Sequence, residues 1–425
     1  MSRKKLLVRG PALSRSGYGE QCRFALRSLR AHENIFDIYL LVTNWGHTGW
    51  MIEDNEERRW LDDLAKKTAF YQQQKPPVYT GYDMSLQVTI PNEWEKMAPI
   101  NIGYTAGIEA TKVAPEWLQK AQLMDRIIVV SNHAKQVYKD TSYTATNEQT
   151  GEVINDFRCE VPITVCNYPV KHFEAANVNL DFETDFNYLI VAQWGPRKNV
   201  KNAVKWFLEE YEDEPNVGLV LKVNTVNNSF MDRYNTKNNV KSLLSEHKDR
   251  KCKIYLVHGA MTDEEMTALY QHPKIKCVVS LAHGEGFGLP LFEAAYNEVP
   301  VLAPAWSGYC DFMYAPVRNK KGKVKNKALF ARVDYTLAPI QKNVIWPGVL
   351  NADMLWCYPE KNSYKAKLRE VYRDYNRFKS QAKILKNHIE KNFVAEKQYK
   401  IFAEAVMGTD IEIAEAMSNE QVFVL

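Results

Sequence analysis

The chain has 425 residues, a length that usually divides into two or three domains, and we expect two. A quarter of the residues are charged and the formal net charge is only +4, which is typical of a soluble globular protein and does not indicate a nucleic-acid coat or a membrane arm. The seven cysteines are scattered and form no C-x-x-C pair, so we expect reduced thiols in a cytoplasmic protein.

The first residues, MSRKKLLVRGPALS, have the positive start of a signal peptide but only three apolar residues where a long apolar stretch is required. No later segment approaches the run of about 18 apolar residues that a membrane-spanning helix needs. We therefore expect neither export nor a spanning helix.

The first half of the chain alternates short apolar runs with amphipathic stretches. KKLLVRG predicts a strand and EQCRFALRSLRAH a helix, and the glycine-containing bend PALSRSGYGE lies between them. This order opens a doubly wound α/β domain. The same rhythm predicts further strands at residues 37–44, 100–110, 125–131 and 163–170, helices at 115–124 and 132–140, and a hairpin or loop at 142–160.

A second series of strands and helices follows a polar joint at residues 178–186. Strands are predicted near 187–193, 217–224, 252–260, 277–282 and 299–304, and Thr262 is a candidate N-cap for the helix at 262–272. Two doubly wound series predict two Rossmann-like domains that face each other across a deep cleft. We place the first domain at residues 1–178 and the second at 179–392.

The stretch HGEGFGLPLFEAA after the predicted strand 277–282 places two glutamates, Glu285 and Glu293, eight positions apart around a glycine-rich bend. Ligands of parallel sheets bind at the carboxyl ends of strands, where helix N-termini supply partial positive charge. Gly286 and Gly288 permit close approach of the backbone, and both carboxylates can accept hydrogen bonds from vicinal hydroxyls. The alternative is a tight turn with an acidic residue that favours the start of a helix.

The run E-G-F-G-L-P-L-F-E resembles the E-x7-E signature of retaining, nucleotide-sugar-dependent glycosyltransferases of the GT-B fold, particularly family four. VAQWGPRKNV is similar to that family's P-R-K-N loop, HGAMTDEEMTALY to its nucleotide-base loop, and SGYGEQCRFALRSL to its N-terminal glycine loop. Residues 104–138 also resemble the family's N-terminal domain. The resemblance covers most of the chain and implies the GT-B fold, with a C-terminal helix, at about 393–425, crossing back to the first domain.

The resemblance also implies a transfer chemistry that basic side chains support. Departure of a nucleoside diphosphate concentrates negative charge on its phosphates, and Arg197 and Lys198 can neutralise this charge without a metal. Many relatives carry Arg at the loop position where this chain has Gln193, so the division of phosphate binding is left open. We expect no metal and no cofactor, a UDP- or GDP-linked sugar as substrate, and Arg197, Lys198 and Glu285 as catalytic residues. The expected donor-binding residues are Gly17, Tyr18, Gly19, Lys222, Met261, Gly286, Phe287, Gly288, Leu289 and Glu293.

Other residues carry weaker signals. Glu109, which ends a predicted strand, is a candidate acceptor-binding residue or a helix cap. His283 is interpreted as structural, and His258 as bordering the base pocket through its backbone. The helix face with Arg23, Arg27 and Arg30 could meet anionic lipid heads, which would make the protein a peripheral membrane protein.

The sequence alone does not identify the acceptor. Residues 318–327 (RNKKGKVKNK) hold six basic residues and no acidic one, which suits a polyanionic acceptor or a solvated hairpin that turns at Gly322. Within the transferase reading, the acceptor is a glycan or lipid-linked glycan, or a hydroxylated base in viral DNA. Other classes are a non-catalytic nucleotide-sugar or glycan-binding protein, and an epimerase or phosphorylase of similar architecture. The oligomeric state is not predicted.

Overall fold

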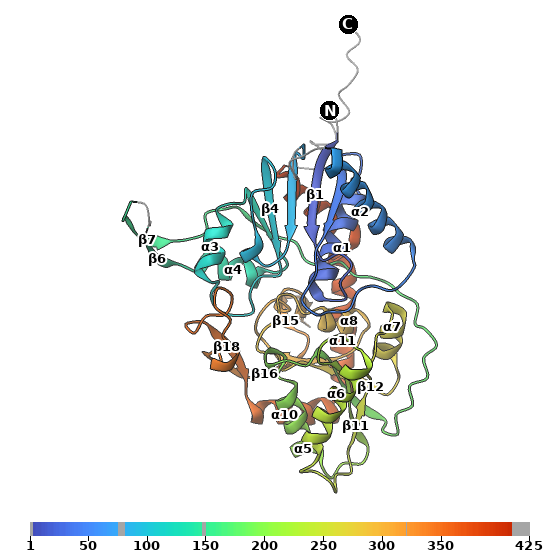
Figure 1. The fold of residues 1–425 in the computed structure, drawn as a ribbon. Coiled ribbons are helices and arrows are strands. Elements are labelled where there is room, and N and C mark those ends of the chain that lie inside the picture. The colour runs from blue at the N-terminus through green and yellow to red at the C-terminus, as the bar shows by residue number, and fades with distance from the viewer. Residues whose placement is uncertain (1–2, 75–80, 147–149, 320, 410–425) are drawn as a thin grey trace. The chain divides into compact units, whose positions relative to one another are not determined.

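The computed structural model describes residues 3–74, 81–146, 150–319 and 321–409. The chain forms two compact units (Figure 1). Unit 1 comprises Met1–Pro169, Ile340–Met354 and Ala395–Leu425, and unit 2 comprises Val170–Pro339 and Leu355–Val394.

Unit 1 is built on a six-stranded parallel sheet with the order β2-β1-β3-β4-β5-β8. The predicted strand–loop–helix at the start of the chain forms as β1 and α1. The apolar residues of β1 are buried in the sheet, and the side chain of Ser16 caps α1. The strands are β1 (Lys4–Gly10), β2 (Phe36–Val42), β3 (Met84–Val88), β4 (Ile100–Thr105), β5 (Arg126–Val129) and β8 (Ile163–Val165). The helices are α1 (Gly17–Arg30), α2 (Glu56–Gln74), α3 (Pro115–Ala121), α4 (Asn132–Asp140) and α12 (Ala395–Met407), with the short η1 (Pro91–Glu93).

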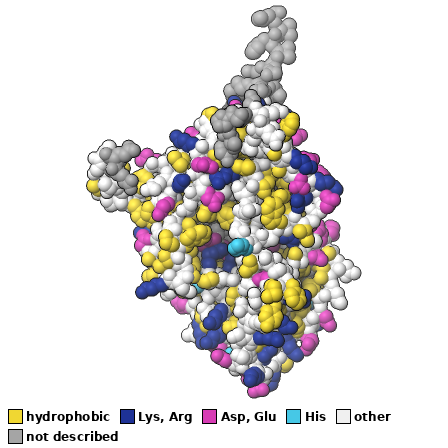
Figure 2. Space-filling view, viewed as in Figure 1, with side chains coloured by type: hydrophobic (Ala, Val, Ile, Leu, Met, Phe, Trp, Pro, Cys, Tyr) yellow, Lys and Arg dark blue, Asp and Glu magenta, His cyan; other side chains and the backbone are white. Residues whose placement is uncertain are grey.

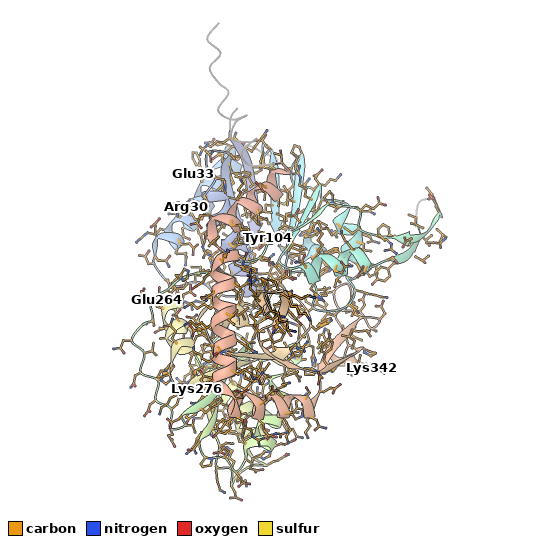
Figure 3. The ribbon with its side chains drawn as sticks, turned by 180° about the vertical axis from the view of Figure 1, so that it is seen from behind. Arg30, Glu33, Tyr104, Glu264, Lys276 and Lys342 are labelled. Carbon is orange, nitrogen blue, oxygen red and sulfur yellow. The ribbon has the colours of Figure 1, made fainter. Side chains whose placement is uncertain are left out.

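Helix α12 packs against α1, so the C-terminal part of the described chain completes the core of unit 1. Phe402 of α12 contacts the rings of Phe24 and Tyr104, with centroids 5.4 and 5.0 Å away. Figure 3 labels Tyr104 in the interior of this unit. The predicted return of a C-terminal helix to the first domain is confirmed for α12, and residues 410–425 lie outside the described chain.

Unit 2 repeats the same architecture with the strand order β11-β10-β9-β12-β13-β16. Its core includes Tyr188 of β9, Phe207 of α5 and Tyr364 of α10. The strands are β9 (Phe186–Gln193), β10 (Val217–Asn224), β11 (Lys253–Leu256), β12 (Ile275–Val279), β13 (Val301–Pro304) and β16 (Ala331–Val333). The helices are α5 (Val200–Tyr211), α6 (Phe230–Leu244), α7 (Asp263–Gln271), α8 (Leu289–Tyr296), α9 (Cys310–Met313), α10 (Lys361–Arg373) and α11 (Tyr375–Asn392), with the short η2 (Pro196–Lys198).

Within the described residues, three antiparallel strand pairs lie outside the two sheets. The first, β6 (Tyr143–Thr146) with β7 (Val153–Phe157), agrees with the hairpin predicted at 142–160. The second, β14 (Tyr314–Arg318) with β15 (Val324–Ala328), carries the basic segment 318–327 and turns at Gly322, whose φ is +79°. The third joins β17 (Tyr335–Pro339) to β18 (Leu355–Pro359).

The segment between β17 and β18 leaves unit 2 and belongs to unit 1, which the sequence did not predict. Within this segment, which contains η3 (Lys342–Val344), the Gly348 carbonyl accepts a 2.8 Å hydrogen bond from Asn92 Nδ2. Asn92 in turn accepts a 2.6 Å bond from the indole of Trp117. The chain therefore crosses between the units four times, at residues 169/170, 339/340, 354/355 and 394/395. Crossings near 178 and 393 were expected, whereas the excursion of residues 340–354 was not.

The fold class predicted from the sequence, two Rossmann-like α/β domains, is confirmed. All seven cysteines are free, and five of them are buried. Within the described residues, no helix combines the length and hydropathy that a bilayer-spanning segment needs. On the face shown in Figure 2, Lys and Arg side chains are interspersed with Asp and Glu over the surface.

Candidate functional site

The loop after β9 carries the two basic residues that the sequence singled out. Gly195 leads into η2, which contains Arg197 and Lys198, and Asn199 then adopts a left-handed conformation (φ 53°) before α5 begins. Asn199 is buried, and its amide donates a 3.2 Å hydrogen bond to the Leu281 carbonyl on the neighbouring loop. Both cations therefore sit at the carboxyl end of β9, where ligands of such sheets bind.

The loop after β12 packs directly against this basic loop. The His283 amide donates to the Arg197 carbonyl at 2.8 Å. The Glu285 amide donates to the hydroxyl of Ser307 at 3.0 Å, and the Glu285 carbonyl accepts from the Gly308 amide at 2.9 Å. The backbone of Glu285 is thus fixed by the segment that follows β13, so that three consecutive strand ends of unit 2 contribute to one place.

Arg197, Lys198 and Glu285 form a charged cluster there. Lys198 Nζ lies 2.5 Å from one carboxylate oxygen of Glu285, and Arg197 Nη1 lies 3.2 Å from the other. Arg197 also donates a 2.7 Å bond to the Gly284 carbonyl. Burial of Glu285 would raise the pKa of its carboxyl, but the charges and hydrogen bonds of Lys198 and Arg197 outweigh this effect and lower it. The carboxylate stays ionised at neutral pH, and the cluster keeps one net positive charge.

The second glutamate of the motif follows on α8. Gly288 is in the left-handed region (φ 91°) and acts as the N-cap, and Pro290 occupies the first turn as expected. Glu293 is half-buried and accepts a 2.9 Å hydrogen bond from the hydroxyl of Tyr270 on α7. Glu293 therefore lies where α7 and α8 meet, with its carboxylate already engaged on one side.

Residues of the glycine-rich bend divide into packing and backbone roles. The ring of Phe287 is buried against Phe292 and Phe312, with centroids about 5.1 and 5.0 Å away, so its side chain belongs to the core. Leu289 and Met261 are partly exposed. A Cβ at position 308 would overlap the carbonyl oxygen of Gly286, which shows how closely the segment after β13 approaches the bend.

Lys222 and His258 lie beside the loop that was predicted to hold the base. Lys222, near the carboxyl end of strand β10, donates a 2.5 Å hydrogen bond to the Gly259 carbonyl. His258 Nε2 lies 3.0 Å from the carboxylate of Asp232 on α6, and both side chains are almost fully buried, at 2% and 3% exposure. The backbone of His258 was expected to matter more than its side chain, and the structure shows that the side chain is engaged by Asp232.

Asp232 is a buried residue of this region that the sequence reading missed. Besides His258, it accepts hydrogen bonds from the Thr225 hydroxyl and from the backbone amides of Val226 (2.9 Å) and Asn228 (3.1 Å). Burial raises the pKa of this carboxyl, and these hydrogen bonds more than reverse the effect and lower it. Asp232 ties the loop after β10 to the loop after β11. The available signal was the S-x-x-D pattern that begins at Ser229, which caps α6.

Four expected site residues lie in unit 1. Gly17 starts α1 and is exposed, whereas a Cβ on Gly19 would overlap the Ser14 carbonyl, so only Gly19 needs the absence of a side chain. The ring of Tyr18 stacks on Trp45 with centroids 4.0 Å apart, and its hydroxyl lies 2.9 Å from Thr105 Oγ1. Burial raises the pKa of this phenol, which keeps it neutral.

Glu109 follows β4 in the same unit and is partly exposed, and it influences the pKa of Tyr18 electrostatically. The role of Glu109 in acceptor binding stays a prediction. His283 has the structural role that was expected, because it stacks on Trp356 with centroids 5.1 Å apart and its Nδ1 lies 2.7 Å from the Cys357 carbonyl.

The expectation of a basic α1 face that meets anionic lipid is wrong. Arg23 is buried, and its guanidinium donates to carbonyls of the preceding loop and to Glu20. Arg27 pairs with Glu20 and Glu57, and Arg30 pairs with Glu56. The positive charges of this helix are paired within unit 1 with acidic residues of α1 and α2.

Several solved structures have a fold similar to that of this chain. Among solved structures, sucrose-phosphate synthase from Thermosynechococcus elongatus superposes with a TM-score of 0.59 at 13% identity, covering 96% of this chain and 99% of that chain. A glycosyltransferase from Rickettsia africae gives 0.58 at 12% identity, covering 99% and 100%. HepE from Anabaena, in complex with UDP and glucose, gives 0.56 at 12% identity, covering 96% and 100%.

These structural similarities show that the chain has the GT-B fold. No curated protein sequence matches the chain. Residues 173–319, which hold Arg197, Lys198, Glu285 and Glu293, match the family of glycosyl transferases group 1. The chain is therefore a glycosyltransferase of the GT-B fold that takes its sugar from a nucleotide-sugar donor, and its residues 173–319 are similar to the glycosyl transferases group 1.

Proposed function

We propose that the protein transfers a sugar from a UDP- or GDP-linked donor to a hydroxyl of a glycan or lipid-linked glycan, without a metal and with retention at the anomeric carbon. The observation that carries this proposal is the Arg197–Lys198–Glu285 cluster at the carboxyl ends of β9 and β12. It combines two cations suited to a diphosphate with one carboxylate suited to sugar hydroxyls.

Arg197 and Lys198 stabilise the departing nucleoside diphosphate. As the bond between the anomeric carbon and the phosphate oxygen breaks, the electron pair goes to that oxygen and negative charge grows on the diphosphate. Arg197 offers a planar set of donors and Lys198 a compact charge, and both are largely shielded from solvent, with 30% and 19% of their side chains exposed. Partial burial strengthens their interaction with the growing charge, because water screens it less.

The incoming hydroxyl attacks the same face of the sugar that the diphosphate leaves. Its proton passes to the departing phosphate oxygen while the new carbon–oxygen bond forms, so that atoms and charges balance without an enzymatic base. The transition state has oxocarbenium character, as in glycoside hydrolysis. Glu285, ionised at neutral pH, holds Lys198 and Arg197 in place and accepts hydrogen bonds from the sugar.

The donor nucleotide is proposed to lie over three loops of unit 2. The backbone of the bend around Gly286 and Gly288 faces the phosphates and sugar, Glu293 binds the ribose, and Lys222, Leu289 and Met261 border the base and sugar. Asp232 and His258 fix the loops after β10 and β11 on which this base site depends. Gly17, Tyr18, Gly19 and Glu109 are proposed to contribute from unit 1.

The test measures release of nucleoside diphosphate from a panel of UDP- and GDP-sugars, with and without glycan acceptors, followed by mass spectrometry of the products. Acceptor-dependent release with a transferred sugar supports the proposal. Donor binding without release in any combination indicates a non-catalytic binding protein, and conversion of the free sugar nucleotide without acceptor indicates an epimerase. Transfer only to DNA with hydroxylated bases contradicts the proposed glycan acceptor.

A further inference from the structure

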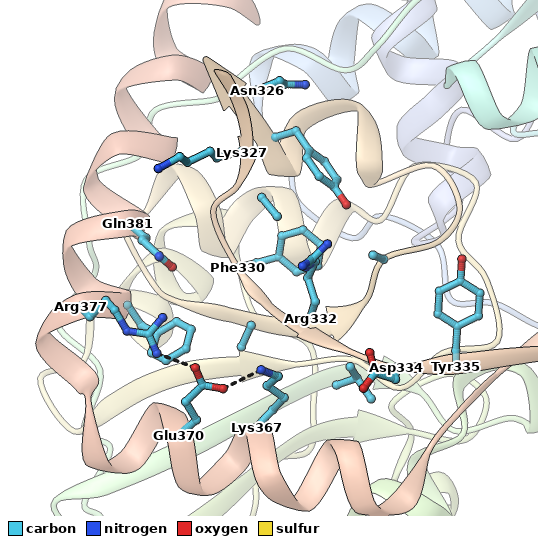
Figure 4. A pocket seen from close by; sticks show the side chains of 16 residues that line it. Asn326, Lys327, Phe330, Arg332, Asp334, Tyr335, Lys367, Glu370, Arg377 and Gln381 are labelled. Carbon is cyan, nitrogen blue, oxygen red and sulfur yellow. Dashed lines mark hydrogen bonds and ion pairs between the residues drawn. The ribbon is translucent and has the colours of Figure 1, made fainter. Parts of the chain in front are cut away.

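Unit 2 contains an open groove of about 910 Å³ that is separate from the Arg197–Lys198–Glu285 cluster (Figure 4). It runs along β16, the last strand of the sheet, and is bordered by β15 on one side and by α10 and α11 on the other. Its volume falls within the range of about 300–1,000 Å³ that is typical of sites for small molecules or short chain segments.

The groove carries an excess of positive charge. Lys327 and Arg332 are exposed, and neither side chain has a hydrogen-bond or ion-pair partner among the described residues. Lys367 and Arg377 also line the groove, and both contact the carboxylate of Glu370 at 2.6 Å, as the dashed lines in Figure 4 show. Arg377 also pairs with Asp374 at 2.5 Å, so Lys367 and Arg377 are balanced by two carboxylates. The positive excess of the groove therefore comes from Lys327 and Arg332, against the single carboxylate of Asp334.

The rest of the lining suits sugar rings. Tyr314 and Tyr335 are half-buried and Phe330 is buried at the floor, with the rings of Tyr314 and Phe330 5.8 Å apart. Aromatic faces pack on the apolar faces of sugars, while the amides of Asn326 and Gln381 can donate to and accept from hydroxyls. A lining with aromatic rings, amides and cations therefore fits a saccharide that also bears negative charge.

The groove adjoins the segment that fixes Glu285. Ala305, which lines it, lies two residues before Ser307, the acceptor of the Glu285 amide, so their Cα atoms are at most about 7.6 Å apart. A chain bound along β16 would thus extend towards the carboxyl ends of β12 and β13.

We propose that this groove is an accessory site for an anionic saccharide chain, whose carboxylate, sulfate or phosphate groups pair with Lys327 and Arg332. That the bound saccharide is the acceptor of the reaction rests on the proposed transferase function. Binding of the saccharide in the groove does not depend on that function. A nucleic acid is the less suitable occupant, because the acidic groups of Asp334 and Glu370 lie within the groove and would face its closely spaced phosphates.

The test is binding of a fluorescently labelled galacturonic-acid hexasaccharide to the full chain, compared with a neutral glucose hexasaccharide and with oligothymidylate. We expect the acidic hexasaccharide to bind at least about tenfold more tightly than the neutral one, with affinity that falls as salt is added. The Lys327→Gln, Arg332→Gln double variant should lose about tenfold in affinity, because two charge-assisted contacts disappear. Lys248→Gln, which alters an exposed basic residue of the same unit outside this groove, is the matched control and should bind normally.

Three results would overturn the proposal: equal binding of acidic and neutral hexasaccharides, unchanged affinity of the double variant, or tighter binding of oligothymidylate. Binding of a UDP-sugar to the double variant is measured in parallel and should match that of the unmodified chain, which shows that unit 2 is folded. Failure of all nucleotide sugars to bind would contradict the proposed function while leaving the saccharide measurement intact.

Discussion

Lys198 and Glu285 form an ion pair of 2.5 Å between loops that follow different strands of the unit 2 sheet, with only 19% and 11% of their side chains exposed. If Lys198 stabilises the departing diphosphate, Lys198→Ala should lower kcat by about 10²–10³-fold. Donor affinity should fall much less, because the charge of the leaving group grows only as the bond breaks. Steady-state kinetics and direct titration of the donor measure the two effects separately.

Lys201→Ala supplies the control for that experiment. Lys201 lies only three residues further along, on the exposed side of α5, and should be replaceable without change in either quantity. An equal loss of turnover and donor affinity in Lys198→Ala would show that the side chain binds donor and transition state alike, and would contradict the proposed role.

Gly308 is predicted to be irreplaceable because of its contact with the glycine-rich bend. Its Cβ would collide with the carbonyl of Gly286, and its amide holds the Glu285 carbonyl at 2.9 Å. Gly308→Ala should therefore displace the bend and lower transfer by at least about tenfold, as judged by diphosphate release. Gly195→Ala adds a Cβ that meets no atom within 4 Å and should keep nearly full activity. Comparable losses in both variants would show that the close approach is not the cause.

The sequence predicted those features that depend on local order. The succession of strand, loop and helix placed Arg197 and Lys198 at the end of β9, and Glu285 at the end of β12. Adjacent parallel strands bring their carboxyl ends together, so the neighbourhood of these loops followed from topology. Thr262 caps α7 and forms a capping box with Glu265, as its position before acidic residues indicated.

Features that depend on distant segments were not predictable. The pattern of Arg23, Arg27 and Arg30 on one helix cannot show that α2 would pack beside it and supply Glu57. Similarly, Asp232 reads as an ordinary residue of a polar helix until His258 is folded against it. The passage of residues 340–354 into unit 1 depends on Asn92, more than two hundred residues away, and leaves no local signal.

The Asp232–His258 pair gives a prediction about both stability and donor binding. Asp232→Ala leaves His258 and the amides of Val226 and Asn228 buried without their acceptor, which should lower the free energy of unfolding of unit 2 by about 3–5 kcal/mol. The released loops should also weaken donor binding. Urea unfolding and donor titration measure these effects.

Asp249→Ala removes an exposed carboxylate from the same unit and serves as the control for Asp232→Ala, with an expected change within about 0.5 kcal/mol. Donor affinity that is unchanged in a folded Asp232→Ala protein would show that these loops do not form the base site. A stability loss similar to that of the control would show that the hydrogen bonds of Asp232 are not stabilising.

His133 on α4 should make unit 1 sensitive to acid. Burial lowers the pKa of this imidazole from 6.5 to about 4, and backbone groups of Ile108 and Ala110 offset the effect only in part. Between these two values the unfolded chain binds a proton that the folded chain does not, so stability is lost as the pH falls from about 6.5 to about 4. The loss due to this group should reach about 1–3 kcal/mol.

His133→Gln cannot take up a proton, so its free energy of unfolding should depend less on pH across this window than that of the unmodified chain. His47→Gln, at an exposed position of the same unit, should leave the pH dependence unchanged. Urea unfolding at several pH values between 7.5 and 4, followed by NMR titration of the imidazole protons, distinguishes the two cases. If the His133 signal titrates near 6.5 and the pH profiles of the three proteins coincide, the imidazole is hydrated rather than buried, and the acid sensitivity of unit 1 has another source.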